Sequence, residues 1–189
     1  MKAPEVYKTL RDDIGPWAAA GGFKRTKTML SWYRPCGRQY IVFWFQVSRH
    51  GWDTYAGSEF TVEFQLSPEP VVGEVHSLRR RLSEFLDDAS REEARQIQNQ
   101  ILASIPRPPP DYWLLEDPRL RAGYLREFDP HPRYSRRHDI WFRYHAPEHL
   151  HRWSEFILRH LPRCIEELEA AEAQQQAAPQ QRRAWWKLW

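Results

Sequence analysis

Hydrophobic side chains at the start of the chain recur with the period of a helix. Successive members are four, four and three residues apart, which places them on one stripe of a 3.6-residue helix: Val6, Leu10, Ile14 and Trp17. Two glycines at 21–22 are typical of a helix end, so we predict a helix over residues 3–20. Similar stripes predict helices over residues 90–105, beginning at the capping-box residue Ser90, and over residues 147–168.

A second pattern, with a period of two, predicts strands. The clearest alternation runs from Glu59 to Leu66, where apolar and polar side chains point to opposite faces. Residues 39–48 are apolar on both faces, which is typical of a central strand, and residues 140–144 alternate again. Short connections favour antiparallel pairing. We predict an α+β fold, in which an antiparallel sheet of about four to five strands is packed by N-terminal, central and C-terminal helices.

The remaining segments carry weaker patterns. Apolar spacing predicts a short helix over residues 78–86, and residues 116–138 show no period, so we expect a loop there. Residues 173–189 are rich in Gln and Ala and end in a Trp-rich basic segment. We therefore predict a single α+β domain over residues 1–172, followed by a flexible tail over residues 173–189.

Composition excludes several classes of protein. The chain has 189 residues, of which 14% are aromatic and 10 are Trp, too many for a disordered chain. Two cysteines, Cys36 and Cys164, are too few for a disulfide scaffold or a four-cysteine zinc site. No apolar run approaches the roughly 18 residues of a membrane helix, and acidic residues precede any apolar stretch at the N-terminus. We expect a cytoplasmic protein with no transmembrane segment.

Four short segments carry a family resemblance. They are a Gly-Phe-Lys element at residues 22–25, an aromatic segment at 31–34, a hydrophobic strand ending in Gln at 41–48, and a strand at 60–64. Their order resembles that of the bacterial domain-of-unknown-function family 4304, over about residues 5–67 and more faintly over residues 140–161. The family has no agreed activity, so the resemblance implies a fold and carries over no catalytic residue. Many small bacterial families of this style are immunity or partner proteins, which is an analogy at the level of the fold.

The histidines and cysteines do not form a convincing site. His149 and His151 would project about 200° apart on a helix, so that they do not readily share a metal with His145. Cys36 lies in a Pro-Cys-Gly turn, where a catalytic thiol would need a base such as His50 within hydrogen-bond reach. We interpret these residues as solvated histidines and an ordinary thiol, and we predict no metal and no cofactor.

Two carboxylates on one strand face raise the alternative of an enzyme. Glu59 and Glu63 would lie about 13 Å apart along a strand, whereas the carboxyl pairs of glycosidases lie about 5–9.5 Å apart. We therefore interpret them as a solvated face that opposes arginines such as Arg143. The enzyme alternative requires that Glu59, Glu63, Arg143 and His145 converge on one concave site.

Basic and aromatic clusters raise the alternative of nucleic-acid binding. Arginines at 79–81 and 133–137 accompany aromatic residues that could stack on bases. However, the net charge is only +3 and acidic runs are interleaved with the basic ones. The terminal Trp185-Trp186 pair, with Trp189, fits either docking on a partner or weak contact with a membrane surface.

We predict a non-enzymatic intracellular binding protein of the immunity or partner-neutralising type. Its partner would be a protein, such as a toxin, and the nucleic-acid and enzyme alternatives stay open. The prediction rests on aromatic and arginine side chains in expected loops and the tail, a composition typical of recognition surfaces. The predicted binding residues are Trp52, Trp113, Tyr124, Tyr134, Trp141, Arg143, Trp185 and Trp186.

Overall fold

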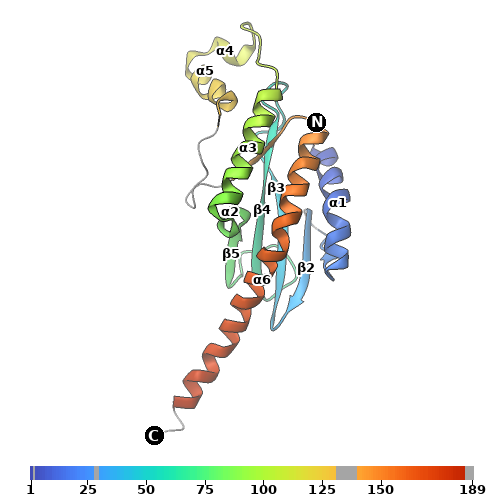
Figure 1. The fold of residues 1–189 in the computed structure, drawn as a ribbon, viewed down its shortest axis with the longest axis vertical. Coiled ribbons are helices and arrows are strands. Elements are labelled where there is room, and N and C mark those ends of the chain that lie inside the picture. Colours follow the sequence, from blue (N-terminus) through green and yellow to red (C-terminus); the bar gives the residue numbers. More distant parts are fainter. Residues whose placement is uncertain (2, 28–29, 131–139, 186–189) are drawn as a thin grey trace.

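The fold is an α+β arrangement of one antiparallel sheet and the helices that pack on it (Figure 1). The computed structural model describes residues 1, 3–27, 30–130 and 140–185, with side chains as far as residue 177. The helices are α1 (Ala3–Ala20), α2 (Leu82–Phe85), α3 (Asp88–Ser104), α4 (Trp113–Glu116), α5 (Pro118–Leu125) and α6 (Pro147–Trp185), with a 3-10 turn η1 (Arg126–Phe128). The strands are β1 (Lys24–Arg25), β2 (Leu30–Cys36), β3 (Gln39–Val47), β4 (Ser58–Ser67), β5 (Leu78–Arg81) and β6 (Phe142–Tyr144).

The sheet has β3 and β4 at its centre. Within the described residues it has six strands, in the order β1-β2-β3-β4-β5, and β6 also pairs with β4. Every pair is antiparallel, which confirms the prediction for the fold class. The short strands β5 and β6 share one edge of β4. There β5 pairs with Glu63–Leu66 and β6 pairs with Ser58–Phe60, so residues of β6 come to lie beside the beginning of β4.

One face of the sheet forms the hydrophobic core. The alternation predicted for β4 is confirmed, because Phe60 and Phe64 are fully buried beside Phe43 and Phe45 of β3. Figure 1 shows α1, α3 and α6 side by side over this face, and their apolar stripes belong to the same cluster of buried residues. Trp153 of α6 is fully buried there and donates from Nε1 to the Arg143 carbonyl oxygen at 2.7 Å.

The opposite face of β4 is also buried, so the expectation of a solvated polar face was wrong. Glu63 is only 2% exposed, because Arg79 and Arg81 of β5 lie against its carboxylate. Farther along the strand, Gln65 donates to the carbonyl oxygen of Val71 at 2.7 Å. Polar side chains can be buried when they are paired in this way. Alternation therefore identified the strand but did not reveal that both of its faces are covered.

Two other segments differ from the predictions. Where we predicted a helix over residues 78–86, residues 78–81 form the strand β5 and only residues 82–85 are helical. The sequence did not predict this strand, because four edge residues without alternation carry no strand signal. Residues 113–128, which overlap the expected loop, contain α4, α5 and η1.

Two helix boundaries also differ. The N-cap of α3 is Asp87, which accepts from the Ser90 backbone nitrogen at 2.8 Å, so this helix starts before the predicted cap. Helix α6 continues to Trp185, past residue 168, where we predicted that it ends. Among the described helices, none combines the length and the apolar character needed to cross a membrane.

Candidate functional site

A cleft of about 500 Å³ lies between the β3–β4 loop and the segment that contains α4 and α5. In Figure 1 this segment lies at the upper end of the molecule, beyond the end of α3. We call it the aromatic cleft, because it brings together four of the predicted binding residues: Trp52, Trp113, Tyr124 and Arg143. Loops at the end of a sheet are common positions for binding residues, because the rigid sheet holds them in place.

The floor of the cleft is set by the pairing of β4 with β6. Glu59 and Arg143 are partners in the register of these strands. The Arg143 side chain is buried, and its Nη1 donates to the Ala56 carbonyl oxygen at 2.7 Å. Its Nη2 donates to the carboxylate of Glu127 in η1 and lies 3.6 Å from Glu59 Oε2. The guanidinium group thus joins β6 to the loop, to β4 and to η1.

Glu59 is a carboxylate in an unusual electrostatic environment. Burial raises its pKa above the ordinary value for a glutamate, Arg143 acts against this shift, and the neighbouring Glu127 adds to it. Desolvation disfavours the charged form of a carboxyl group, and a nearby like charge has the same effect. The cleft therefore holds two carboxylates against one guanidinium group.

Asp53 attaches the wall of the cleft to the β3–β4 loop. Its carboxylate accepts from the hydroxyl groups of Tyr112 and Tyr124, the second at 2.6 Å, and from the backbone nitrogens of Tyr55 and Ala56. Burial acts to raise the pKa of Asp53, but the hydrogen bonds from Tyr112, Tyr124 and the backbone together hold it below the ordinary value. Burial and the bond to Asp53 raise the pKa values of both tyrosines. We call Asp53, Tyr112 and Tyr124 together the tyrosine clamp.

Two tryptophans in the lining of the cleft are exposed to solvent. Trp52, in the β3–β4 loop, is 38% exposed, and Trp113, the first residue of α4, is 62% exposed. The Trp52 ring lies 5.6 Å from the His145 ring, and the Trp113 ring lies 6.0 Å from that of Tyr112. Each indole is therefore supported from one side while a large part of its surface faces solvent.

The other predicted binding residues do not join this cleft. Trp141 lies next to the paired arginines of β5, with the Arg81 guanidinium 5.8 Å from its ring centre. Trp185 is the last residue of α6, and its side chain is outside the described part of the structure. Tyr134 and Trp186 lie outside the described residues altogether.

The four residues required by the enzyme alternative do not converge. Glu59 and Arg143 line the cleft, but Glu63 is paired with Arg79 at 2.8 Å farther along the sheet. His145 is not among the residues that line the cleft; its ring contacts that of Trp52, and its Nε2 lies 2.7 Å from the carbonyl oxygen of Thr54. The proposed arrangement on one concave surface was therefore wrong as a set of four.

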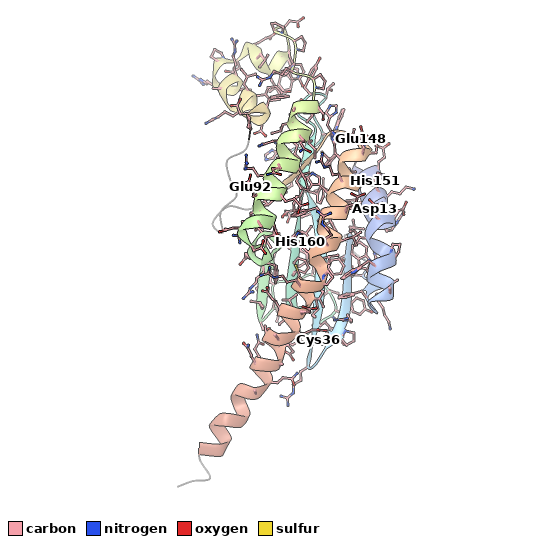
Figure 2. All side chains as sticks on the ribbon, viewed as in Figure 1. Asp13, Cys36, Glu92, Glu148, His151 and His160 are labelled. Carbon is pink, nitrogen blue, oxygen red and sulfur yellow. The ribbon has the colours of Figure 1, made fainter. Side chains whose placement is uncertain are left out.

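The histidines of α6 have structural contacts. His149 Nδ1 accepts from the backbone nitrogens of His145 and Ala146, so it caps the start of the helix. Figure 2 shows His151 beside Asp13 of α1, and its Nδ1 lies 2.8 Å from that carboxylate. In the described residues, no three His, Cys, Asp or Glu side chains are grouped so that they could hold a metal ion.

Cys36 and His50 lie near opposite ends of β3. Cys36 ends β2 at the end of the sheet shown low in Figure 2, whereas His50 lines the aromatic cleft. Burial, with Glu169 and Glu172 nearby, raises the pKa of the Cys36 thiol. A raised pKa disfavours the thiolate that nucleophilic chemistry needs.

The prediction of binding residues missed Asp53 and Glu127. Asp53 has a detectable signal, because Asp in a loop followed by Gly57 is typical of a turn in which the carboxylate binds nearby backbone nitrogens. Glu127 has no such signal, since its partner Arg143 lies 16 positions later, beyond the reach of a local turn. Compared with protein-family models, with curated proteins and with solved structures, the chain matches none of them, and the resemblance to family 4304 stays a prediction.

Proposed function

We propose that this chain is a non-enzymatic binding protein that recognises a partner protein through the aromatic cleft. The observation that carries the proposal is the convergence of Trp52, Trp113, Tyr124 and Arg143 on one open cleft. Trp, Tyr and Arg are the residue types that contribute most to the binding energy of protein interfaces. Two exposed indoles on a supported wall provide a large contact area at a small cost in conformational entropy.

The charges favour a protein over a nucleic acid as the partner. Asp53, Glu59 and Glu127 line the same cleft, and carboxylates repel phosphate groups. Outside the cleft, Arg79 is paired with Glu63, and Arg80 lies 3.5 Å from the carboxylate of Glu167. These arginines therefore share their surroundings with acidic groups, which does not favour a concentrated basic face for a nucleic acid.

The proposal includes a partner-neutralising role of the immunity type. A protein of this type binds the partner in a stoichiometric complex and covers the surface that the partner uses. The proposal thus predicts that the activity of the purified partner falls to near zero when one equivalent of this chain is added. An unchanged partner activity in a formed complex would contradict the neutralising role and leave the binding role intact.

Capture of the partner with matched variants tests the binding role. The full chain, the double variant W52A/W113A and the control V71A/V75A are used as baits in lysate of the source organism. The control also removes exposed apolar side chains, which lie outside the cleft. We expect the wild type and the control to retain the same stoichiometric protein. W52A/W113A should bind it at least about 30-fold more weakly, the factor that corresponds to the loss of a single hot-spot residue of about 2 kcal/mol.

Binding constants of the purified pair, measured by calorimetry, give the decisive comparison. Equal affinity of W52A/W113A and the wild type would refute the aromatic cleft as the recognition site. Circular dichroism of the variants shows whether they are folded, and we expect them to be, since both indoles are partly exposed.

A further inference from the structure

The aromatic cleft has an excess of negative charge. Besides His50 and the phenol of Tyr124, the ionisable groups that line it are the carboxylates of Asp53, Glu59 and Glu127 and the guanidinium group of Arg143. Arg143 is 5% exposed and its Nη2 already lies against Glu59 and Glu127, so its positive charge is paired with carboxylates of the cleft itself. A ligand that enters the cleft therefore meets an acidic surface whose lining includes two exposed indoles.

The same chain shows what fills such surroundings elsewhere. The Arg79 guanidinium lies 4.9 Å from the ring centre of Trp44 and, through Nη2, 2.8 Å from the carboxylate of Glu63. It is thus held between an indole and a carboxylate, the combination that favours a planar cation. Arg25 likewise lies 5.0 Å from the ring centre of Trp32.

The two indoles of the cleft differ from Trp44 and Trp32. Within the described part of the chain, no guanidinium group lies over the ring of Trp52 or Trp113, and both rings are more than one third exposed. Carboxylates line the same cleft as these two indoles. The lining of the cleft thus includes indoles and carboxylates, the two kinds of group that contact Arg79, around a free volume of about 500 Å³.

We propose that the aromatic cleft binds an arginine side chain of the partner protein, with the guanidinium group against Trp52 or Trp113 and facing Glu59. The inference rests on the proposed function and specifies the chemistry of its partner. Glu59 is the charged residue of the cleft whose removal is best tolerated. Its contact with Arg143 is the longer one at 3.6 Å, and Glu127 remains to pair with Arg143 after Glu59→Gln.

Small probes test this inference without knowledge of the partner. N-acetyl-arginine amide, N-acetyl-lysine amide and the neutral isostere N-acetyl-citrulline amide are titrated into the full chain. Nitrogen–proton correlation spectra follow the indole signals, which are assigned with W52F and W113F. We expect arginine amide to shift the signals of Trp52 and Trp113 in a saturable manner. Citrulline amide should bind at least about 5-fold more weakly, because it lacks the charge that the carboxylates and indoles attract.

A pair of charge variants provides the matched control. Glu59→Gln should weaken arginine amide binding about 3- to 10-fold, whereas Glu74→Gln, at an exposed position away from the cleft, should leave it unchanged. The dispersion of the remaining signals shows that both variants are folded. Equal affinity for arginine and citrulline amides, tighter binding of lysine amide, or wild-type affinity of Glu59→Gln would each overturn the inference.

Failure of the inference is distinguishable from failure of the proposed function. A partner that is retained by the wild type, lost from W52A/W113A and bound normally by Glu59→Gln would overturn the arginine inference and support the binding role. Specific binding of arginine amide to a chain that retains no partner would support the chemistry of the cleft and contradict the protein-binding role.

Discussion

The tyrosine clamp predicts how firmly α4 and α5 are attached to the rest of the fold. The double variant Y112F/Y124F removes the two hydroxyl groups that donate to Asp53 and keeps both rings. Both rings keep their packing in the variant: the ring centre of Tyr112 lies 4.8 Å from that of Tyr55, and the ring centre of Tyr124 lies 5.4 Å from that of Phe128. Any change therefore reports on the hydrogen bonds of the two hydroxyl groups, chiefly those to Asp53.

The expected magnitude follows from the environment of the acceptor. A hydrogen bond to a charged group contributes about 1.5–3 kcal/mol when it is desolvated. Asp53 is only partly buried, so we take about 1 kcal/mol for each bond. The double variant should lose about 2 kcal/mol, which raises the population of the detached state of α4 and α5 about 30-fold. The two losses need not be additive, because both hydroxyl groups share one carboxylate.

Native-state hydrogen exchange measures this population. In α5 the backbone nitrogens of Leu120 and Arg121 donate to the Asp117 carbonyl oxygen, and their exchange should accelerate about 30-fold in Y112F/Y124F. Exchange in the β3–β4 pair should stay unchanged. Tyr33→Phe, which removes a hydroxyl group outside the cleft, serves as the control. If α5 exchanges at the wild-type rate in the double variant, the clamp does not hold the wall of the cleft.

Three further predictions concern the surroundings of the cleft. Lowering the pH should release α4 and α5, because the pKa of Asp53 is depressed in the folded chain. The stabilisation by the Asp53 carboxylate is complete above the ordinary pKa of about 4 and is lost as the pH falls through the lower pKa of the folded chain. Tryptophan fluorescence would follow this release. Trp153→Phe should cost about 2–3 kcal/mol in urea unfolding, because it leaves the Arg143 carbonyl oxygen buried without this donor. Gly57→Ala should lower the free energy of unfolding by about 2 kcal/mol or more, since φ is 70° and a Cβ would lie 2.2 Å from a carbonyl oxygen of β6. The control Gly73→Ala should be neutral in the same assay, because its added Cβ would have no neighbouring group within 4 Å.

The fold class followed from local periodicity. The alternation in β4 and the stripe of Val6, Leu10 and Ile14 predicted elements that the structure confirms, because a buried face requires apolar residues at the period of its own secondary structure. The same patterns missed β5, whose four residues depend on pairing with β4 rather than on their own alternation. They also missed the burial of Glu63, since alternation does not reveal which segment covers a polar face.

The candidate site was predictable in part. Aromatic residues in segments without a core pattern, such as Trp52 and Trp113, were selected from the chain alone because no periodic stripe required them. What they form together was not predictable, because Tyr112 and Asp53 are 59 positions apart. A hydrogen bond between two loops leaves no periodic trace in either of them.

The amino-acid pattern thus determined the long helices, the central strands with their antiparallel pairing, and the choice of loop aromatics, all of which depend on neighbours within a few residues. The cleft itself arose from tertiary contacts. Pairing of β4 with β6 places Arg143 beside Glu59. The hydrogen bond from Tyr124 to Asp53 attaches the segment of α4 and α5 to the β3–β4 loop. These contacts join residues that are remote in sequence. They can stabilise the cleft only after the sheet and α6 have brought the segments together, because closing the long loops between them costs conformational entropy.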